Sequence, residues 1–149
     1  MYRNIDENLE VFLVHPGGPF WAKKDYGFWS IPKGEYEEGE DPLDAARREF
    51  HEETGFSAQG MFLELGTIKQ TGGKIVTAWA VEGNCDPQLL KSNLCKVEWP
   101  PRSLRLIEIP EVDRGGWFSI AEAAERIVKS QQPLLKTLCI RLEQNCSSE

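Results

Sequence analysis

Short apolar runs separated by turn residues predict several β-strands along the chain. Residues 9–14 read LEVFLV, a mostly apolar run typical of a buried strand, and a Pro-Gly-Gly-Pro turn follows it at 16–19. The runs at 61–69 and 74–81 flank Thr71-Gly72-Gly73, which is a hairpin-turn signal. Further strands are predicted at 28–31, 94–98 and 104–109.

The clearest helix signal covers Pro42 to Thr54. Asp41 can accept hydrogen bonds from the free N–H groups of the first turn, and proline suits the first helical position because it lacks an N–H. Gly55 can adopt the left-handed conformation that closes the helix. The start and the end of this helix are therefore both encoded locally.

Two more helices are predicted near the end of the sequence. Ser119 and Glu122 form a capping box that begins a helix over 120–130. A last helix begins at Pro133, with apolar residues on one face, and the tail after about residue 145 is expected to be disordered. This order of elements predicts one α+β domain over residues 1–149, with a mixed β-sheet between helices.

Three glutamates form the main chemical feature of the 42–54 helix. Glu49, Glu52 and Glu53 stand at positions i, i+3 and i+4, which places their carboxylates on one face. Like charges held this close repel one another, and a divalent cation removes the repulsion. Carboxylate oxygens suit Mg²⁺, with Mn²⁺ as the alternative. Arg48 can steer Glu49 through a forked hydrogen bond.

A glutamate-rich helix is more often a solvated face, so the wider spacing decides the interpretation. The sequence from 34 to 56 reads GEYEEGEDPLDAARREFHEETGF and has Gly34, then Glu40 after five residues, then Arg48-Glu49 after seven. This pattern resembles the box of the Nudix pyrophosphohydrolases, with no position missing. Outside the box, the segments at 15–35, 97–103, 110–118 and 132–135 resemble a bacterial group of predicted NTP pyrophosphohydrolases within that MutT-like superfamily.

The resemblance implies a Nudix-type α/β/α sandwich. Members of the family usually begin with a strand that carries an Ala-Gly or Gly-Ala pair, upstream of the segment that matches Tyr2-Arg3 here. The sheet is therefore expected to lack that first strand, or to replace it.

The resemblance also implies the roles of the box residues. Glu49, Glu52 and Glu53 would bind metal, together with the carbonyl of Gly34, and Arg48 would orient Glu49. Glu40 would support the loop. The general base stays open between Glu53, Glu52 and Glu111.

Glu111 lies six residues before Trp117, an offset at which many Nudix enzymes place an acid above the metals. It is therefore a candidate metal ligand or general base, and the alternative is a solvated loop acid.

The substrate contacts are predicted from residue type and position. Lys33 precedes Gly34 at the mouth of the box and is a candidate phosphate ligand, as is Arg102. Trp29 is a candidate for stacking on a nucleobase, with Trp21, Phe28 and Trp99 as further aromatic candidates. Core packing is the alternative for each aromatic residue, and surface charge is the alternative for Arg102.

Composition narrows the class of partner. The chain has 149 residues and a net charge of −7, which disfavours binding to a nucleic-acid polymer. We expect no membrane span and no signal peptide. We expect four reduced cysteines and a cytoplasmic location. A homodimer is compatible with the sequence.

The expected activity is metal-dependent hydrolysis of a nucleoside diphosphate linked to another group, by attack of water on phosphorus. The preferred substrates are nucleoside triphosphates or dinucleoside polyphosphates. ADP-ribose or another nucleotide sugar is the alternative. Two further classes are a nucleotide-sensing domain without catalysis, disfavoured because the box acids are all present, and a structural protein with a chance acidic face.

Overall fold

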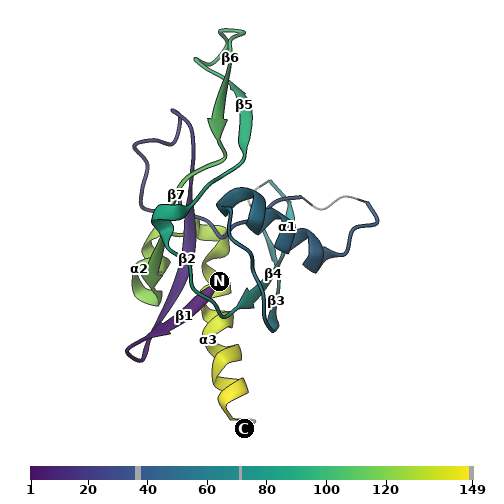
Figure 1. The fold of residues 1–149 in the computed structure, drawn as a ribbon, viewed down its shortest axis with the longest axis vertical. Helices are drawn as coiled ribbons and strands as arrows, with labels where there is room; N and C mark the ends of the chain where they lie inside the picture. Colours follow the sequence, from purple (N-terminus) through teal and green to yellow (C-terminus); the bar gives the residue numbers. More distant parts are fainter. Residues whose placement is uncertain (36–37, 71, 148–149) are drawn as a thin grey trace.

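The computed structural model describes residues 1–35, 38–70 and 72–147 of the chain (Figure 1). The strands are β1 (Tyr2–Ile5), β2 (Asn8–Pro16), β3 (Phe62–Lys69), β4 (Ile75–Val81), β5 (Leu94–Glu98), β6 (Leu106–Pro110) and β7 (Val112–Ser119). The helices are α1 (Pro42–Thr54), α2 (Ile120–Arg126) and α3 (Gln132–Cys146), with short 3-10 turns η1 (Pro87–Leu89) and η2 (Lys129–Gln131). The predicted α+β class is confirmed.

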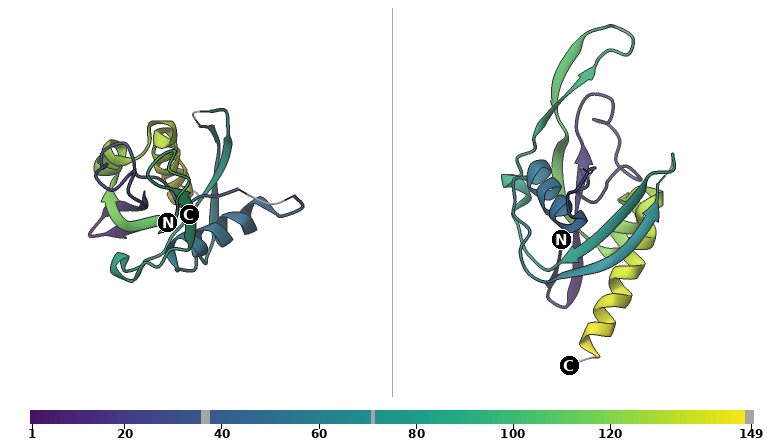
Figure 2. Two further views of the ribbon diagram at one scale, coloured as in Figure 1. Left: turned by 90° about the horizontal axis from the view of Figure 1, so that it is seen from above. Right: turned by 90° about the vertical axis from the view of Figure 1, so that its right-hand side faces the viewer.

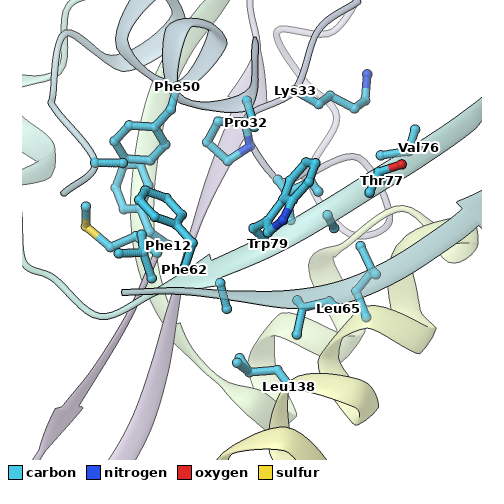
Figure 3. Close-up of a pocket in the computed structure, with 18 of the residues that line it drawn as sticks. Phe12, Pro32, Lys33, Phe50, Phe62, Leu65, Val76, Thr77, Trp79 and Leu138 are labelled. Atoms are coloured by element: carbon cyan, nitrogen blue, oxygen red, sulfur yellow. The ribbon is translucent and has the colours of Figure 1, made fainter. Parts of the chain in front are cut away.

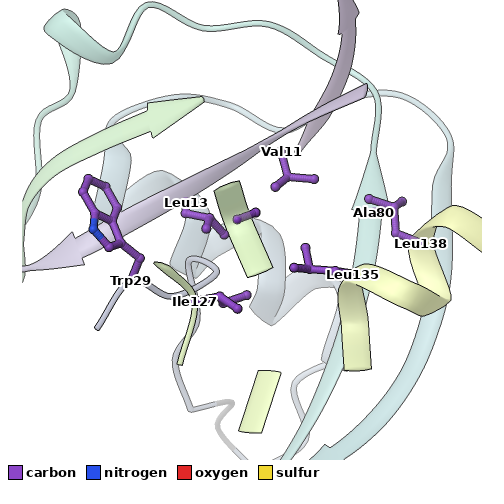
Figure 4. Close-up of a cluster of buried hydrophobic side chains, with 8 residues drawn as sticks. Val11, Leu13, Trp29, Ala80, Ile127, Leu135 and Leu138 are labelled. Carbon is purple, nitrogen blue, oxygen red and sulfur yellow. The ribbon is translucent and has the colours of Figure 1, made fainter. Parts of the chain in front are cut away.

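Strand β2 is the central element of the fold. It pairs antiparallel with β1 on one side and with β7 on the other. Val11 and Leu13 join one buried cluster, and Phe12 and Val14 join another, because successive side chains of a strand point to opposite faces. Figure 4 shows the first cluster, in which Leu135 and Leu138 of α3 lie among residues of β2 and Ala80 of β4.

Helix α1 forms as its local signals predict. The Asp41 carboxylate accepts hydrogen bonds from the N–H groups of Leu43 and Asp44 at 3.0 and 3.2 Å. Gly55 has a φ of 79° and closes the helix in the left-handed region. Phe50 faces the second core cluster, so the opposite face is left for the acids.

Strand β7 was not predicted from the sequence, because glycine and charged residues occupy positions where strands usually carry β-branched or aromatic residues. Gly115 is required by packing. A Cβ atom there would lie 2.5 Å from the Phe12 ring, so a larger residue cannot occupy this position on β7. Strand β1 was also missed, because it lies among polar residues at the start of the sequence.

Several predicted boundaries need correction. The 28–31 segment forms isolated bridges, from Ser30 to Val14 and from Trp29 to Ile127, and is not a continuous strand. The helix after Ser119 ends at Arg126 instead of 130, since Ile127 turns into an extended conformation and η2 follows. Thr71 in the predicted hairpin turn lies outside the described residues, as do residues 148–149 of the tail.

An apolar hollow of about 160 Å³ lies where α1, β2 and the β3–β4 hairpin meet (Figure 3). Phe50, Phe62 and Trp79 line it, and Met1 stands at its wall. Tyr2 forms a parallel bridge to Glu82 just after β4, so β1 connects the two sheets at this end. The expectation that the sheet lacks a family strand concerns this region and stays an expectation.

The β5–β6 hairpin projects from the body of the domain, as Figure 1 and the right-hand view of Figure 2 show. Helix α3 extends in the opposite direction and packs against β3. The acidic helix and the loops next to it lie between these two extensions.

Candidate active site

Two acids of α1, and Glu40 in the loop before the helix, are gathered around one guanidinium group. Arg48 donates from Nε and Nη2 to both carboxylate oxygens of Glu40, at 2.9 and 3.0 Å. Its Nη1 donates to Glu49 at 3.0 Å and to Glu52 at 3.1 Å. The hydrogen bonds to Glu40 and Glu52, together with the charges of Glu40 and Glu49, keep the pKa of Arg48 above its usual value. Arg48 therefore orients two of the three predicted ligands.

The Lys33-Gly34 backbone closes the other side of this cluster. The N–H of Lys33 donates to Glu53 Oε2 at 3.0 Å. A Cβ atom on residue 34 would lie 1.9 Å from Glu49 Cδ, so only glycine lets the chain pass this close to the carboxylate. The loop and the helix thus place the Gly34 backbone directly against the Glu49 carboxylate.

Burial raises the pKa values of two of these acids, Glu53 and Glu49. Glu53 is a buried residue, and this burial is the main reason that its pKa rises to about 8, although the Lys33 N–H bond opposes the rise. The pKa of Glu49 is also raised, first by burial and then by the charge of Glu52. The nearby Glu111 carboxylate adds to both shifts. Burial and the neighbouring carboxylates therefore both disfavour the ionised forms of Glu49 and Glu53.

Glu111 lies between β6 and β7, with its backbone fixed on both sides. Its N–H donates to the Asn93 carbonyl at 3.0 Å, and its own carbonyl accepts from the Gly17 N–H at 2.9 Å. Its side chain lines the same pocket as Glu53. The structure therefore brings Glu111 to the acidic site, as the offset from Trp117 predicts.

A pocket of about 390 Å³ opens beside Glu53 and Glu111. Trp21 and Phe28 line it, with ring centroids 5.6 Å apart. Lys33 belongs to its wall as well, and polar side chains complete the lining: Ser30, Gln70, Ser130 and Gln131. The pocket combines aromatic faces, hydrogen-bonding groups and a cation next to the carboxylates.

Two of the predicted substrate contacts lie elsewhere. Trp29 is only 5% exposed, packs against Phe118 and donates its indole N–H to Asp25 at 2.7 Å. This burial contradicts the prediction that Trp29 stacks on a nucleobase, and Trp21 and Phe28 line the pocket instead. Arg102 lies in the turn between β5 and β6, exposed to solvent, and is not part of the pocket lining.

Gln131 is a site residue that the sequence did not reveal. It is fully buried, its side-chain oxygen accepts from the Ile31 N–H at 3.0 Å, and its amide donates to Ser30 at 3.0 Å. These contacts hold the segment that leads into Lys33 and Gly34. One hundred residues separate Gln131 from Ile31, so no local signal could have identified the contact.

The donor set of this site fits a hard divalent cation. Among the described residues, no three acidic, histidine or cysteine side chains are already gathered as a metal site. Arg48 holds Glu49 and Glu52, and the Lys33 N–H holds Glu53. The site nevertheless supplies only oxygen ligands, with excess negative charge and a backbone that passes in contact with Glu49.

The fold and this acidic loop–helix site define a class, and the family model for the NUDIX domain matches residues 3–138. The chain belongs to the NUDIX domain family. Nudix hydrolases generally use divalent metal ions. Within the described part of the chain, no helix is long and apolar enough to cross a membrane.

Curated relatives resemble the chain over limited segments. An RNA pyrophosphohydrolase of Bartonella bacilliformis is 51% identical over 37 residues, which is 25% of this chain and 22% of that protein. An 8-oxo-(d)GTP phosphatase of Mycolicibacterium smegmatis is 32% identical over 96 residues, covering 62% of this chain and 27% of that protein. The chain thus spans about a quarter of the length of these relatives.

Solved structures share the fold over nearly the whole chain. The C. elegans Ap4A hydrolase in a binary complex has a TM-score of 0.67 and 20% identity, covering 96% of this chain and 94% of that one. The NUDIX domain of Shewanella oneidensis NrtR, complexed with ADP ribose, has a TM-score of 0.65 and 17% identity, with 95% and 82% coverage. Identities this low establish the fold alone.

Proposed function

We propose that this protein is a Mg²⁺-dependent pyrophosphohydrolase whose substrate is a nucleoside triphosphate or a dinucleoside polyphosphate. The observation that carries the proposal is the position of Glu53. It belongs to the box helix, contacts the Lys33 N–H, and lines the pocket that contains Trp21. The predicted metal face and a nucleotide-sized pocket therefore share one carboxylate.

The site residues would have different roles in the reaction. Glu49, Glu52, Glu53 and the Gly34 carbonyl would hold Mg²⁺, and Glu111 is a further candidate ligand. The bound cation would neutralise charge on the phosphates and favour ionisation of water. Arg48 keeps Glu49 and Glu52 in place, and Lys33 lies where it can pair with a phosphate.

Attack of water on phosphorus requires a general base, for which Glu53, Glu52 and Glu111 remain the candidates. Glu53 and Glu111 face the pocket, whereas Glu52 lies at the more open side of Arg48. Trp21 and Phe28 can hold a nucleobase by stacking, and the polar wall can bond to its edge. With its base held there, the substrate would place its phosphates beside the carboxylates.

ADP-ribose is the second candidate substrate within the same reaction class. The structural neighbour solved with ADP ribose supports it, since that domain shares the fold. An RNA 5′-triphosphate is a third, supported by relatives named RNA pyrophosphohydrolase. The net charge of −7 disfavours long polyanions, so we rank it below a free nucleotide.

A panel of substrates in ¹⁸O-labelled water with Mg²⁺ tests this proposal. It contains the NTPs, diadenosine tetraphosphate, ADP-ribose and a 5′-triphosphorylated RNA. Cleavage of an NTP or of the dinucleotide, with the label on a phosphate product, is the expected result. Nucleotide binding without cleavage of any member would instead support a sensing domain.

A further inference from the structure

His15 is a fully buried polar side chain that has no part in the proposed chemistry. It lies near the end of β2, with none of its surface exposed, and its ring packs edge-on against Trp29 at 5.2 Å between centroids. Burying a polar ring at this depth is unfavourable unless its nitrogens are satisfied.

Both ring nitrogens of His15 contact groups that only accept hydrogen bonds. Nδ1 lies 2.9 Å from Asp113 Oδ1, and Nε2 lies 2.5 Å from the carbonyl oxygen of Lys24. A neutral imidazole has one N–H and can satisfy only one of these acceptors. With Asp113 ionised, both contacts are hydrogen bonds at the same time only when each nitrogen carries a proton, and the Asp113 carboxylate then balances the charge.

The charges around this pair come from three elements. Arg114, paired with His15 across β2 and β7, lies 3.6 Å from Asp113 and 5.3 Å from the Trp29 ring. Asp25 accepts from the Trp29 indole and from Arg126, each at 2.7 Å. Asp113 and Asp25 thus each lie next to an arginine. The loop is bonded at two adjacent residues, at Lys24 by His15 and at Asp25 by Trp29 and Arg126.

The held loop shapes the substrate pocket. The Lys24 N–H donates to the Trp21 carbonyl at 2.9 Å, and the Phe28 N–H donates to the Asp25 carbonyl at 3.0 Å. Trp21 and Phe28 are the aromatic residues of the pocket wall. A direct chain of contacts therefore runs from His15 through Lys24 to Trp21.

We propose that His15 is a doubly protonated positioning residue that fixes the 17–28 loop, and with it Trp21 and Phe28, beside the carboxylate site. The role of the pocket as a nucleotide site rests on the proposed function. The protonation of His15 and its contacts with the loop are independent of that function.

Nitrogen NMR of the imidazole tests the protonation directly. The chain has two histidines, so His51→Gln leaves His15 as the single signal. We expect two ring N–H groups at neutral pH in this variant. In a second variant, with Asp113→Ala added, we expect one N–H, because the balancing carboxylate is gone. A single N–H in His51→Gln alone would overturn the proposal.

Limited trypsin digestion and kinetics test the hold on the loop. Lys23 and Lys24 are exposed, so loosening the loop should increase the rate of cleavage after them in His15→Gln. We also expect KM to rise about tenfold with kcat within about twofold, since uniform binding would be lost. His51→Gln is the matched control and should match the wild type in both assays.

The outcomes separate the two claims. If the wild type cleaves no nucleotide, the proposed function fails, while the NMR and trypsin results still decide the role of His15. If His15→Gln does not fold, Asp113→Ala replaces it, because Asp113 is partly exposed. A lower melting temperature with unchanged trypsin cleavage and unchanged KM would show a purely structural histidine and overturn the proposal.

Discussion

At the residue scale, Arg48 shows how one side chain holds several acids together. Its guanidinium contacts Glu40, Glu49 and Glu52 together. Arginine presents several donors in a rigid plane, whereas lysine is a single charged point. The sequence predicted a forked hydrogen bond from Arg48 to its neighbour Glu49, but that contact is a single bond. The forked pair goes to Glu40 and depends on how the loop folds back.

Arg48→Lys tests this orienting role. We expect kcat to fall about 10-fold to 100-fold, the usual effect of losing a group that orients metal ligands. The charge is retained, so the fold should persist. Arg141→Lys on the exposed face of α3 is the matched control and should keep the wild-type rate. An unchanged rate in Arg48→Lys would remove Arg48 from the account.

The pKa of Glu53 predicts how the stability of the metal-free protein depends on pH. A carboxyl whose pKa is raised from 4.5 to about 8 on folding binds more protons in the native state. Its stabilising contribution is therefore present below pH 4.5 and is lost as the pH rises to about 8. Chemical denaturation in EDTA from pH 5 to 9 should show this loss in the wild type. Glu53→Gln should lack it, and equal slopes for both proteins would contradict the raised pKa.

At the scale of elements, the sequence predicted the features that local signals encode and missed those that depend on distant contacts. Helix α1 was predicted with its bounds because Asp41, Pro42 and Gly55 act within a few residues. The burial of Trp29 and the position of Trp21 depend on how the 17–28 loop packs on β2 and β7. The sequence therefore predicted the acidic face of α1, but it chose a buried aromatic residue, Trp29, for the pocket.

Gln131 tests whether distant contacts hold the active-site loop. Gln131→Ala leaves the partly buried Ile31 N–H without its partner, which should cost about 1–3 kcal/mol of unfolding free energy. The Lys33–Gly34 segment would also be less well held, so kcat should fall. Gln88→Ala, an exposed glutamine in η1, is the matched control and should stay within about 0.5 kcal/mol. Equal stability of the two variants in urea unfolding would contradict this role.

At the scale of the whole molecule, part of the net charge of −7 is concentrated at one site. Glu49, Glu52, Glu53 and Glu111 come from two separate elements and meet beside the pocket. Family membership agrees with a divalent cation at this place. The fold then serves to bring an acidic helix, a glycine loop and an aromatic loop together.

Mg²⁺ should stabilise the protein by relieving this repulsion. At a free concentration about 100 times Kd, linkage gives about 2.7 kcal/mol. For a chain of this size that corresponds to a melting temperature about 5–10 °C higher. Scanning calorimetry with Mg²⁺, and with KCl at the same ionic strength, measures the shift. No difference between the two salts, with Mn²⁺ also inactive, would count against the metal site.

The most direct test of the central claim compares the turnover of Glu53→Gln with that of the wild type, on the best substrate of the panel and with saturating Mg²⁺. Loss of a metal ligand that is also a candidate general base should lower kcat about 100-fold to 10,000-fold. Circular dichroism should show an unchanged fold. Glu125→Gln, an exposed acid on α2, is the control and should retain full activity. A near-normal rate in Glu53→Gln would contradict the assignment of the acidic face of α1 as the catalytic centre.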